Sequence, residues 1–566
     1  MVEQDNDVAG FSNKFNQPLP KADERAAPTF TKAVSAIFVL TVGLFVASRL
    51  WHLTTYSLWA DEIFSLLAAR HNWSGLIAYV AGDIVHPPLF YMLLKLWITI
   101  GGESLLWLKL FPFLISVATL FPLFLLCREL KLRPSEMNLA LVLIAVNGYL
   151  IYFAQELRMY SLLLFLTLCS LWLFVRFFNS PTDAAKRHLM TLFVVHLLLV
   201  YTHYYGWLVV GTEFILVLFW RRRKLPLFAI SIAVLILCFS PWAYTVAQVA
   251  VMKKGLAHKI GWIERPDLYS LLEYYAILNG ELIFRFNTHL RFLLFGSPIL
   301  LWAWPIFSGT RAKDKRRSDT FWLLSLSSFL PIAFAFSVSQ VLPQSVWHPR
   351  YFIFIAVPYM ILVAVAVQRL RPNWVKTAMM LLIVGWAAVA GFKALNGENF
   401  SPRFSNHKVE WDALDHQMMQ AEVIKDGVVK VYSFDARASI PIQFYLDEAH
   451  ERRFQVVTVL GGEDKTIIDN NDDHVISGKK FDLSFWDWDY DKESSVLEGE
   501  HFWITFYEYQ RKEVQRILIN KGYEAGEGFK EGPHSYITLA PVWRQRDRNP
   551  PGLSFNSPPT SLAFSE

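Results

Sequence analysis

The sequence predicts a polytopic α-helical membrane protein that carries a second, water-exposed domain in its C-terminal part. Of its 566 residues, 54% are hydrophobic and only 18% are charged, which is less charge than a soluble protein of this size carries. Several apolar runs approach or exceed the roughly 20 residues that cross a bilayer as a helix. From about residue 400, Lys, Asp and Glu become common and no apolar run is long enough to span.

Basic residues set the predicted topology. Lys21, Arg25 and Lys32 precede the first apolar run, so the N-terminus is expected in the cytoplasm. Later loops that are rich in Lys and Arg alternate with loops that are poor in them, and this alternation predicts eleven spans. The spans are expected at residues 33–50, 105–126, 137–153, 161–178, 189–201, 207–220, 225–244, 290–307, 321–341, 351–367 and 374–395.

Two large outer loops follow from this topology, at residues 52–103 and 246–287. Within the first loop, residues 61–70 place Ile63, Leu66 and Leu67 on one helical face, which predicts an amphipathic helix lying flat on the membrane. The apolar run 87–100 is short for a span, and if it crossed, every later loop would change sides. We interpret it as a re-entrant or interfacial helix.

The chain divides into four predicted parts. Residues 1–30 form a disordered cytoplasmic arm, residues 31–395 the membrane module, residues 400–545 an extracytoplasmic α/β domain, and residues 546–566 a Pro- and Ser-rich disordered tail. In the α/β domain, strands are expected at 428–434, 454–460 and 501–507, and helices at 409–423 and 510–520, with Gly522 as a C-cap.

Polar residues that are unusual beside apolar spans all fall in turns on the predicted outer side. Charged groups at membrane depth are costly, so they tend to be paired and functional. Their shared side therefore predicts one polar cavity. These residues are Asp61, Glu62, His86, Gln155, Glu156, Arg158, Tyr160, His203, Tyr204, His348 and Arg350.

Four motifs in these turns resemble, in order, those of the bacterial membrane glycosyltransferases. They are Trp-Ala-Asp-Glu at 59–62, His-Pro-Pro-Leu-Phe-Tyr at 86–91, Gln-Glu-Leu-Arg-Met-Tyr at 155–160 and His-Pro-Arg-Tyr at 348–351. That family is related to dolichyl-phosphate-mannose–protein mannosyltransferases, lipid A aminoarabinose transferases and rhizobial lipopolysaccharide galacturonosyltransferases. The resemblance covers about residues 30–395; the C-terminal domain has no motif of its own.

The resemblance implies a C-type glycosyltransferase fold and inverting transfer of a sugar from a polyprenyl-phosphate donor to an acceptor hydroxyl. It implies Asp61 as the base that deprotonates the acceptor. Arg350 is the first candidate for binding the departing phosphate, because a guanidinium can grip phosphate oxygens in a fork; Lys253 and Lys254 are weaker candidates. The other expected pocket residues are Glu62, His86, Gln155, Glu156, Arg158, Tyr160, His203, Tyr204, His348 and Tyr351.

The expected partners are the lipid-linked sugar, a glycan, lipid or protein acceptor, and membrane lipid, but no nucleic acid. The expected location is the bacterial inner membrane, with the active site on its periplasmic face. No cofactor is required by the sequence, although Glu62 and His86 could bind a divalent cation; no spacing demands a metal.

Other interpretations of these residues stay open at this point. Asp61 could be an ordinary helix N-cap, and Arg350 could anchor the end of a span. For the whole chain, the alternatives are a transporter or flippase of lipid-linked sugars, a transferase that uses a lipid-pyrophosphate donor, and a non-catalytic scaffold that binds glycans. The sequence does not specify the sugar or the acceptor.

Overall fold

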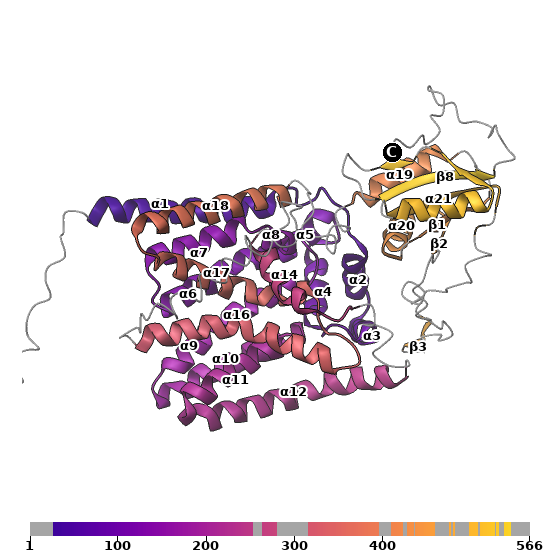
Figure 1. Ribbon diagram of the computed structural model, residues 1–566. Coiled ribbons are helices and arrows are strands. Elements are labelled where there is room, and N and C mark those ends of the chain that lie inside the picture. The colour runs from indigo at the N-terminus through magenta and orange to yellow at the C-terminus, as the bar shows by residue number, and fades with distance from the viewer. Residues whose placement is uncertain are drawn as a thin grey trace, which may run out of the picture.

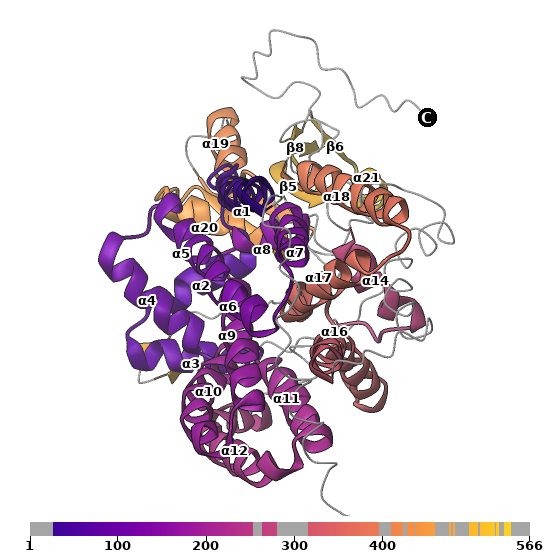
Figure 2. The ribbon, with the colours of Figure 1, turned by 90° about the vertical axis from the view of Figure 1, so that its left-hand side faces the viewer.

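The computed structural model describes the membrane module over residues 27–252, 263–279 and 315–395. In the C-terminal part it describes residues 409–422, 427–434, 436–458, 475–476, 479–480, 497, 499–507, 510–526, 528–530 and 537–544. Most helices of the membrane module run in nearly one direction, and the C-terminal domain sits at one end of this bundle (Figure 1). Figure 2 shows the bundle from its other end. The predicted span 290–307 lies outside the described residues, as do Lys253, Lys254, residues 1–26 and the predicted C-terminal tail 546–566. Residues 27–30, predicted to belong to the disordered arm, instead form the start of the first helix.

Each of the other predicted spans coincides with a helix or a pair of helices. By length and apolar composition, seven of the described helices can cross a membrane, or eight if the bent pair α7 and α8 is one span. The elements at the predicted spans are α1 (Ala27–Leu50), α5 (Leu105–Ala118) with α6 (Leu120–Glu129), α7 (Pro134–Val146) with α8 (Gly148–Ala154), α9 (Tyr160–Asn179), α10 (Thr182–Thr202), α11 (Gly206–Trp220), α12 (Leu225–Met252), α16 (Lys315–Val341), α17 (Ile353–Gln368) and α18 (Asn373–Leu395).

The bend of 61° between α7 and α8 has an identifiable cause. The Asn147 side chain caps α8 by accepting a hydrogen bond from the Leu150 amide at 3.0 Å. The buried guanidinium of Arg49 donates to the carbonyl oxygens of Ile144 and Ala145, which lie in the last turn of α7. A cation at a helix C-terminus is favourable because it meets the negative end of the helix dipole. The bend directs α8 toward the turn at residues 155–159.

The first predicted outer loop forms three short helices: α2 (Ala60–Arg70), α3 (Trp73–Asp83) and α4 (Leu89–Gly101). They lie at the same end of the bundle as the C-terminal domain (Figure 1). With 13 residues, α4 is about 20 Å long, which is too short for the hydrocarbon core of about 30 Å and agrees with the predicted interfacial helix. The amphipathic prediction for α2 was wrong. Its polar and apolar residues are buried together, because α3, α4 and α20 (Ala436–Glu448) pack around it.

The predicted start of the second outer loop also needs correction. Helix α12 continues to Met252, past the expected loop start at residue 246, and α14 (Leu268–Leu278) lies within the predicted loop. Apolar residues continue past residue 246 as far as Met252, so no sharp signal marks the end of the helix.

The C-terminal domain contains a six-stranded mixed sheet. Its strands run in the order β2 (Phe454–Thr458), β1 (Val429–Ser433), β5 (His501–Tyr507), β8 (Ile537–Arg544) and β6 (Tyr523–Ala525), and β7 (Phe529–Lys530) also pairs with β8. The β1 strand is parallel to β2 and β5, whereas β8 is antiparallel to its neighbours. Helices α19 (Trp411–Ala421) and α20 pack on one face of the sheet, and α21 (Arg511–Asn520) packs on the other. A separate hairpin joins β3 (Val475–Ile476) and β4 (Lys479–Lys480).

Three predicted strands and two predicted helices of this domain are confirmed as β1, β2, β5, α19 and α21. Gly522 follows α21 with φ +74°, in the left-handed region that favours glycine at a helix end. The sequence interpretation missed α20, which contains Pro441, and the strands after residue 520. An internal proline normally argues against a helix, so packing of α20 on the sheet outweighs this local signal.

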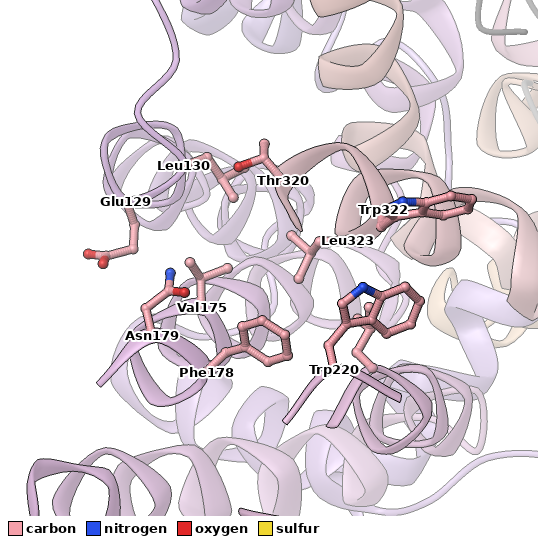
Figure 3. A pocket seen from close by; sticks show the side chains of 10 residues that line it. Glu129, Leu130, Val175, Phe178, Asn179, Trp220, Thr320, Trp322 and Leu323 are labelled. Atoms are coloured by element: carbon pink, nitrogen blue, oxygen red, sulfur yellow. The ribbon is translucent and has the colours of Figure 1, made fainter. Parts of the chain in front are cut away.

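The far end of the bundle fits the predicted inner side. The ends of α6, α9 and α11 meet the first turns of α16 there, around a cavity of about 20 Å³ (Figure 3). This volume is enough for about one water molecule. All four segments were predicted to reach the inner surface at these residues, so the structure agrees with the alternating topology.

Candidate active site at the outer end of the bundle

Asp61 lies in the first turn of α2, at the end of the bundle that carries the C-terminal domain. The residue before the helix is Trp59, so Asp61 is not the N-cap. Its Oδ2 atom lies 2.8 Å from the Nη1 atom of Arg350, with 22% of the Asp61 side chain and 13% of the Arg350 side chain exposed. Arg350 belongs to the short 3₁₀ helix η3 (Pro349–Phe352) that leads into α17. The first and last of the four motifs therefore meet in one partly accessible ion pair.

Arg158 holds the first turn of α2 through hydrogen bonds to its backbone and to nearby side chains. Its Nη1 atom donates to the carbonyl oxygen of Asp61 at 3.0 Å, to Ser65 Oγ at 3.2 Å and to Tyr91 Oη at 3.3 Å. Its Nη2 atom lies 3.4 Å from Nδ1 of His86. The side chain is buried, so Arg158 does not reach out to the membrane surface. The second and third motifs thus join the first through this one guanidinium.

Glu62 points into the protein and away from the Asp61–Arg350 pair. Its Oε1 atom lies 2.6 Å from Lys109 Nζ and accepts a hydrogen bond from the Leu157 amide at 2.6 Å. Its Oε2 atom accepts from the Trp59 amide at 3.3 Å. Both oxygens are occupied, so the expectation that Glu62 orients an acceptor or binds a cation is not supported. Instead, Glu62 connects α2 to α5 and to the turn before α9.

Histidine and tyrosine rings form the wall of the site beside Arg158. The ring centroids of His86 and His203 are 5.3 Å apart, and Tyr351 lies 5.1 Å from His203 and 5.2 Å from His348. The Nε2 atoms of His86 and His203 are buried and have no hydrogen-bond partner among the described residues. Burial, aided by Arg158, lowers the pKa of His86 well below its usual value; burial and His86 do the same for the pKa of His203. Both rings are therefore neutral near pH 7 and can offer a hydrogen bond without charge.

Glu156 and Tyr160 supply two more buried polar atoms that lack partners. Within the part of the chain that the structure describes, neither Glu156 Oε2 nor the Tyr160 hydroxyl has a hydrogen-bond partner. Burial raises the pKa of Glu156 to about 8, and the negative charge of Glu62 adds to the effect. Glu156 is thus largely protonated at neutral pH and can donate a hydrogen bond.

This raised pKa predicts a pH-dependent stability. Below pH 4.5, Glu156 is protonated in both the folded and the unfolded chain, and the stability that it contributes is fully present. As the pH rises from 4.5 to about 8, only the unfolded chain loses the proton, so wild type should lose stability relative to Glu156→Gln. We expect at most about 1.4 kcal/mol per pH unit. Apparent Tm measured against pH for both proteins checks this, and a difference that does not change with pH would contradict the buried, protonated carboxyl.

Two predicted pocket residues have mainly structural contacts. Gln155 donates from its side-chain amide to the carbonyl oxygens of Arg49 and Trp51, at 3.1 and 2.7 Å. The hydroxyl of Tyr204 donates to the Ile84 carbonyl at 3.2 Å and accepts from Trp242 at 3.1 Å. These contacts hold the end of α1 and the turn before His86 in place.

Lys109 was missed in the sequence analysis. A lone lysine in the apolar run 105–126 is a signal that could have been used, because a charge inside a span is normally paired. Among the described residues, no group of three or more His, Cys, Asp and Glu side chains is arranged to hold a metal ion. The cation left open by the sequence therefore gains no support from this part of the chain.

The fold and the site define a polytopic membrane protein whose polar centre is built from turns at one end of the bundle. In its architecture the chain is similar to ArnT from Cupriavidus metallidurans bound to undecaprenyl phosphate, with 12% identity, a TM-score of 0.50, and coverage of 90% of this chain and 98% of that one. The chain has the C-type glycosyltransferase fold, and the predicted resemblance is confirmed at that level.

Two further solved structures match over most of the chain. ArnT from the same organism in the apo state has 13% identity and a TM-score of 0.49, and the match covers 91% of this chain and 98% of that one. An Archaeoglobus fulgidus oligosaccharyltransferase tethered to an acceptor peptide has 13% identity and a TM-score of 0.48, with coverage of 90% and 74%. No protein-family model matches the sequence, and no curated protein does.

Proposed function

We propose that this protein is a membrane glycosyltransferase that transfers a sugar from a polyprenyl-phosphate donor to an acceptor hydroxyl, with inversion at the anomeric carbon. The observation that carries the proposal is the partly exposed Asp61–Arg350 pair, which lies among buried polar groups at the outer end of the bundle. A fold alone does not define an activity, so the site supplies the argument. ArnT, which shares the fold, has been seen with undecaprenyl phosphate, and this is consistent with a polyprenyl donor.

In the proposed reaction Asp61 is the base. Its carboxylate takes the proton of the acceptor hydroxyl as the oxygen attacks the anomeric carbon, and the bond between that carbon and the phosphate oxygen breaks. The electron pair leaves with the phosphate, on the face opposite to the attack, so the configuration inverts. Arg350 binds the departing phosphate, since a guanidinium has five N–H donors and can contact phosphate and carboxylate together.

The lipid part of the donor has a candidate groove next to this centre. An apolar cavity of about 520 Å³ lies between α3, α4, α10 and α12. Its lining includes Pro88, which is two residues after His86, and Leu198, Tyr201 and Trp242. We assign it to the polyprenyl chain, because an apolar chain there would place its phosphate near the histidine wall of the site.

A tryptophan placed in this groove should weaken donor binding. For Leu198→Trp we expect KM for a long-chain polyprenyl donor to rise about 10-fold or more, because the indole overlaps the space of the chain, while kcat changes little. Val194→Trp is the matched control: Val194 lies one turn earlier on α10, is exposed and does not line the cavity. Steady-state kinetics with long- and short-chain donors check this. An equal effect of both variants would show that the groove does not hold the chain.

The proposal places Asp61 outside the cytoplasm, with the N-terminus inside and the C-terminal domain on the periplasmic face of a bacterial inner membrane. The acceptor is a hydroxyl of a glycan, a lipid or a protein.

The test is sugar transfer by the purified full chain in nanodiscs. Radiolabelled polyprenyl-phosphate sugars are supplied with candidate acceptors, and the product's anomeric configuration is determined by NMR. Release of polyprenyl phosphate with an inverted product supports the proposal. Transfer only from a lipid pyrophosphate would favour an oligosaccharide transferase, and movement of intact donor across a bilayer without transfer would favour a flippase.

A further inference from the structure

The three residues before α2 form no regular secondary structure but are almost completely buried. Ser57, Leu58 and Trp59 have exposed fractions of 4%, 3% and 5%, and none of them belongs to a helix or strand. A buried backbone N–H needs a hydrogen-bond acceptor, and a segment without regular secondary structure does not provide one from its own turns. The position of Asp61, two residues after Trp59, therefore depends on what binds this segment.

The C-terminal domain binds it. The Ser57 amide donates to the Val409 carbonyl at 3.2 Å, and the Leu58 amide donates to the Tyr445 hydroxyl at 2.8 Å. The Ser57 hydroxyl also donates to the carboxylate of Asp412. Only the third amide, that of Trp59, is bound within the membrane module, by Glu62. Two of three buried donors are thus satisfied by a domain more than 350 residues away in the chain.

The same domain also holds the other end of α2. Arg70, the last residue of α2, contacts Glu448 of α20 at 2.9 Å as well as Glu103 at 2.7 Å. Its guanidinium lies 5.6 Å from the ring centroid of Phe444. Helix α20 therefore bridges the first and last residues of the α2 region, and the two helices lie side by side in Figure 1.

Apolar packing joins the two modules along this contact. Ile440 and Phe444 belong to the same buried cluster as the residues of the membrane bundle. Tyr445 packs against that cluster and also against the core of the C-terminal domain. Ile440 and Phe444, at positions i and i+4, share one face of α20. Tyr445 lies at the edge of that face, between the two cores. Because the contact is both apolar and hydrogen-bonded, it can fix the position of α2 rather than only link the domains.

We propose that the C-terminal domain completes the active site by positioning Asp61, and that Tyr445 is the positioning residue. This inference rests on the function proposed for Asp61. A base must stay within hydrogen-bond reach of the acceptor hydroxyl, and a misplacement of about 1 Å can cost about 100-fold in rate. Tyr445 contacts neither donor nor acceptor; it acts through the backbone of Leu58, three residues before the carboxylate.

The test is Tyr445→Phe in the full chain. This change removes one hydroxyl and leaves the Leu58 amide buried without its acceptor. We expect hydrogen exchange of the Leu58 amide to become about tenfold faster, since a net hydrogen bond contributes on that order. We expect kcat to fall about 10- to 100-fold with KM for the donor unchanged, because the groups that bind the donor lie elsewhere. Tyr523→Phe is the control: it removes a buried hydroxyl of the same domain that donates to the Leu497 and Gly499 carbonyls, and both readouts should stay at wild-type values.

The two readouts separate the inference from the proposed function. Exchange at Leu58 is measured without substrate, so unchanged exchange in Tyr445→Phe overturns the inference whatever the activity. Faster exchange with wild-type kcat also overturns it, because the segment would then be released without moving the base. If wild type transfers no sugar but exchange at the Leu58 amide is faster in Tyr445→Phe, the proposed function fails. The inference that the C-terminal domain holds the segment before α2 would then still stand. Faster exchange with reduced kcat supports both.

Discussion

Replacing Asp61 by asparagine is expected to lower kcat for sugar transfer by about 10³-fold, within the range of 10²–10⁴ that a general base contributes. The amide has nearly the shape of the carboxylate, and its oxygen can still accept the hydrogen bond from Arg350 Nη1 that is 2.8 Å long in wild type. What it cannot do is take a proton from the acceptor. KM for the donor should therefore change much less than kcat.

Asp83→Asn is the matched control for this experiment. Asp83 is the other carboxylate near the histidines, with Oδ2 3.7 Å from His86 Nδ1, but it has no proposed part in the reaction. Its variant should keep kcat within about tenfold of wild type. If Asp61→Asn is folded by thermal unfolding and turns over at the wild-type rate, Asp61 is not the base. Glu156 would then be tested as the base above pH 8, where its carboxyl is ionised, because Glu62 is held by Lys109.

The membrane helices could be predicted because the bilayer leaves the backbone few choices. A segment in hydrocarbon has to satisfy its own amides, so a long apolar run becomes a helix almost regardless of its neighbours. The positions of the basic loops then predicted on which side of the membrane each helix begins and ends. This prediction placed Asp61, His86, Arg158 and Arg350 at one end of the bundle. The predicted topology could place these residues on one side of the membrane, but it could not predict which side chains contact each other. Asp61 and Arg350 are 289 positions apart in the chain, and only folding shows that they touch.

The contact between the two modules had no signal in the sequence. Tyr445 and Leu58 are 387 positions apart, and the helix that carries Tyr445 was itself missed because of Pro441. The sequence also could not separate two adjacent acids: Asp61 pairs with the partly exposed Arg350, whereas Glu62 is buried against Lys109. On a helix, neighbouring residues point about 100° apart, so Asp61 and Glu62 can serve different environments. A surface acid and a buried one are distinguished only by packing.

Replacing Lys109 by methionine is expected to destabilise the folded protein by about 3–5 kcal/mol, the usual cost of breaking a buried ion pair. Methionine fills nearly the same space, but it leaves the Glu62 carboxylate buried with two amide contacts and no cation. Unfolding by urea in mixed micelles, monitored by tryptophan fluorescence, measures the change. Lys186→Met, at an exposed position at the start of α10, should change the stability by less than about 0.5 kcal/mol.

The double variant Lys109→Met with Glu62→Gln decides whether the cost comes from charge. The glutamine side chain keeps an oxygen for the Leu157 or Trp59 amide but carries no charge, so no ion is left buried. We expect the double variant to be more stable than Lys109→Met alone. We also expect its cost to be about 1–3 kcal/mol less than the sum of the two single costs, which is a coupling energy typical of residues in direct contact. If the double variant is as unstable as the sum of the two single variants, the residues do not interact as an ion pair. In that case the link between α2, α5 and the turn before α9 depends on the amide contacts alone, and Asp61 would be positioned mainly by Arg158 and by the C-terminal domain.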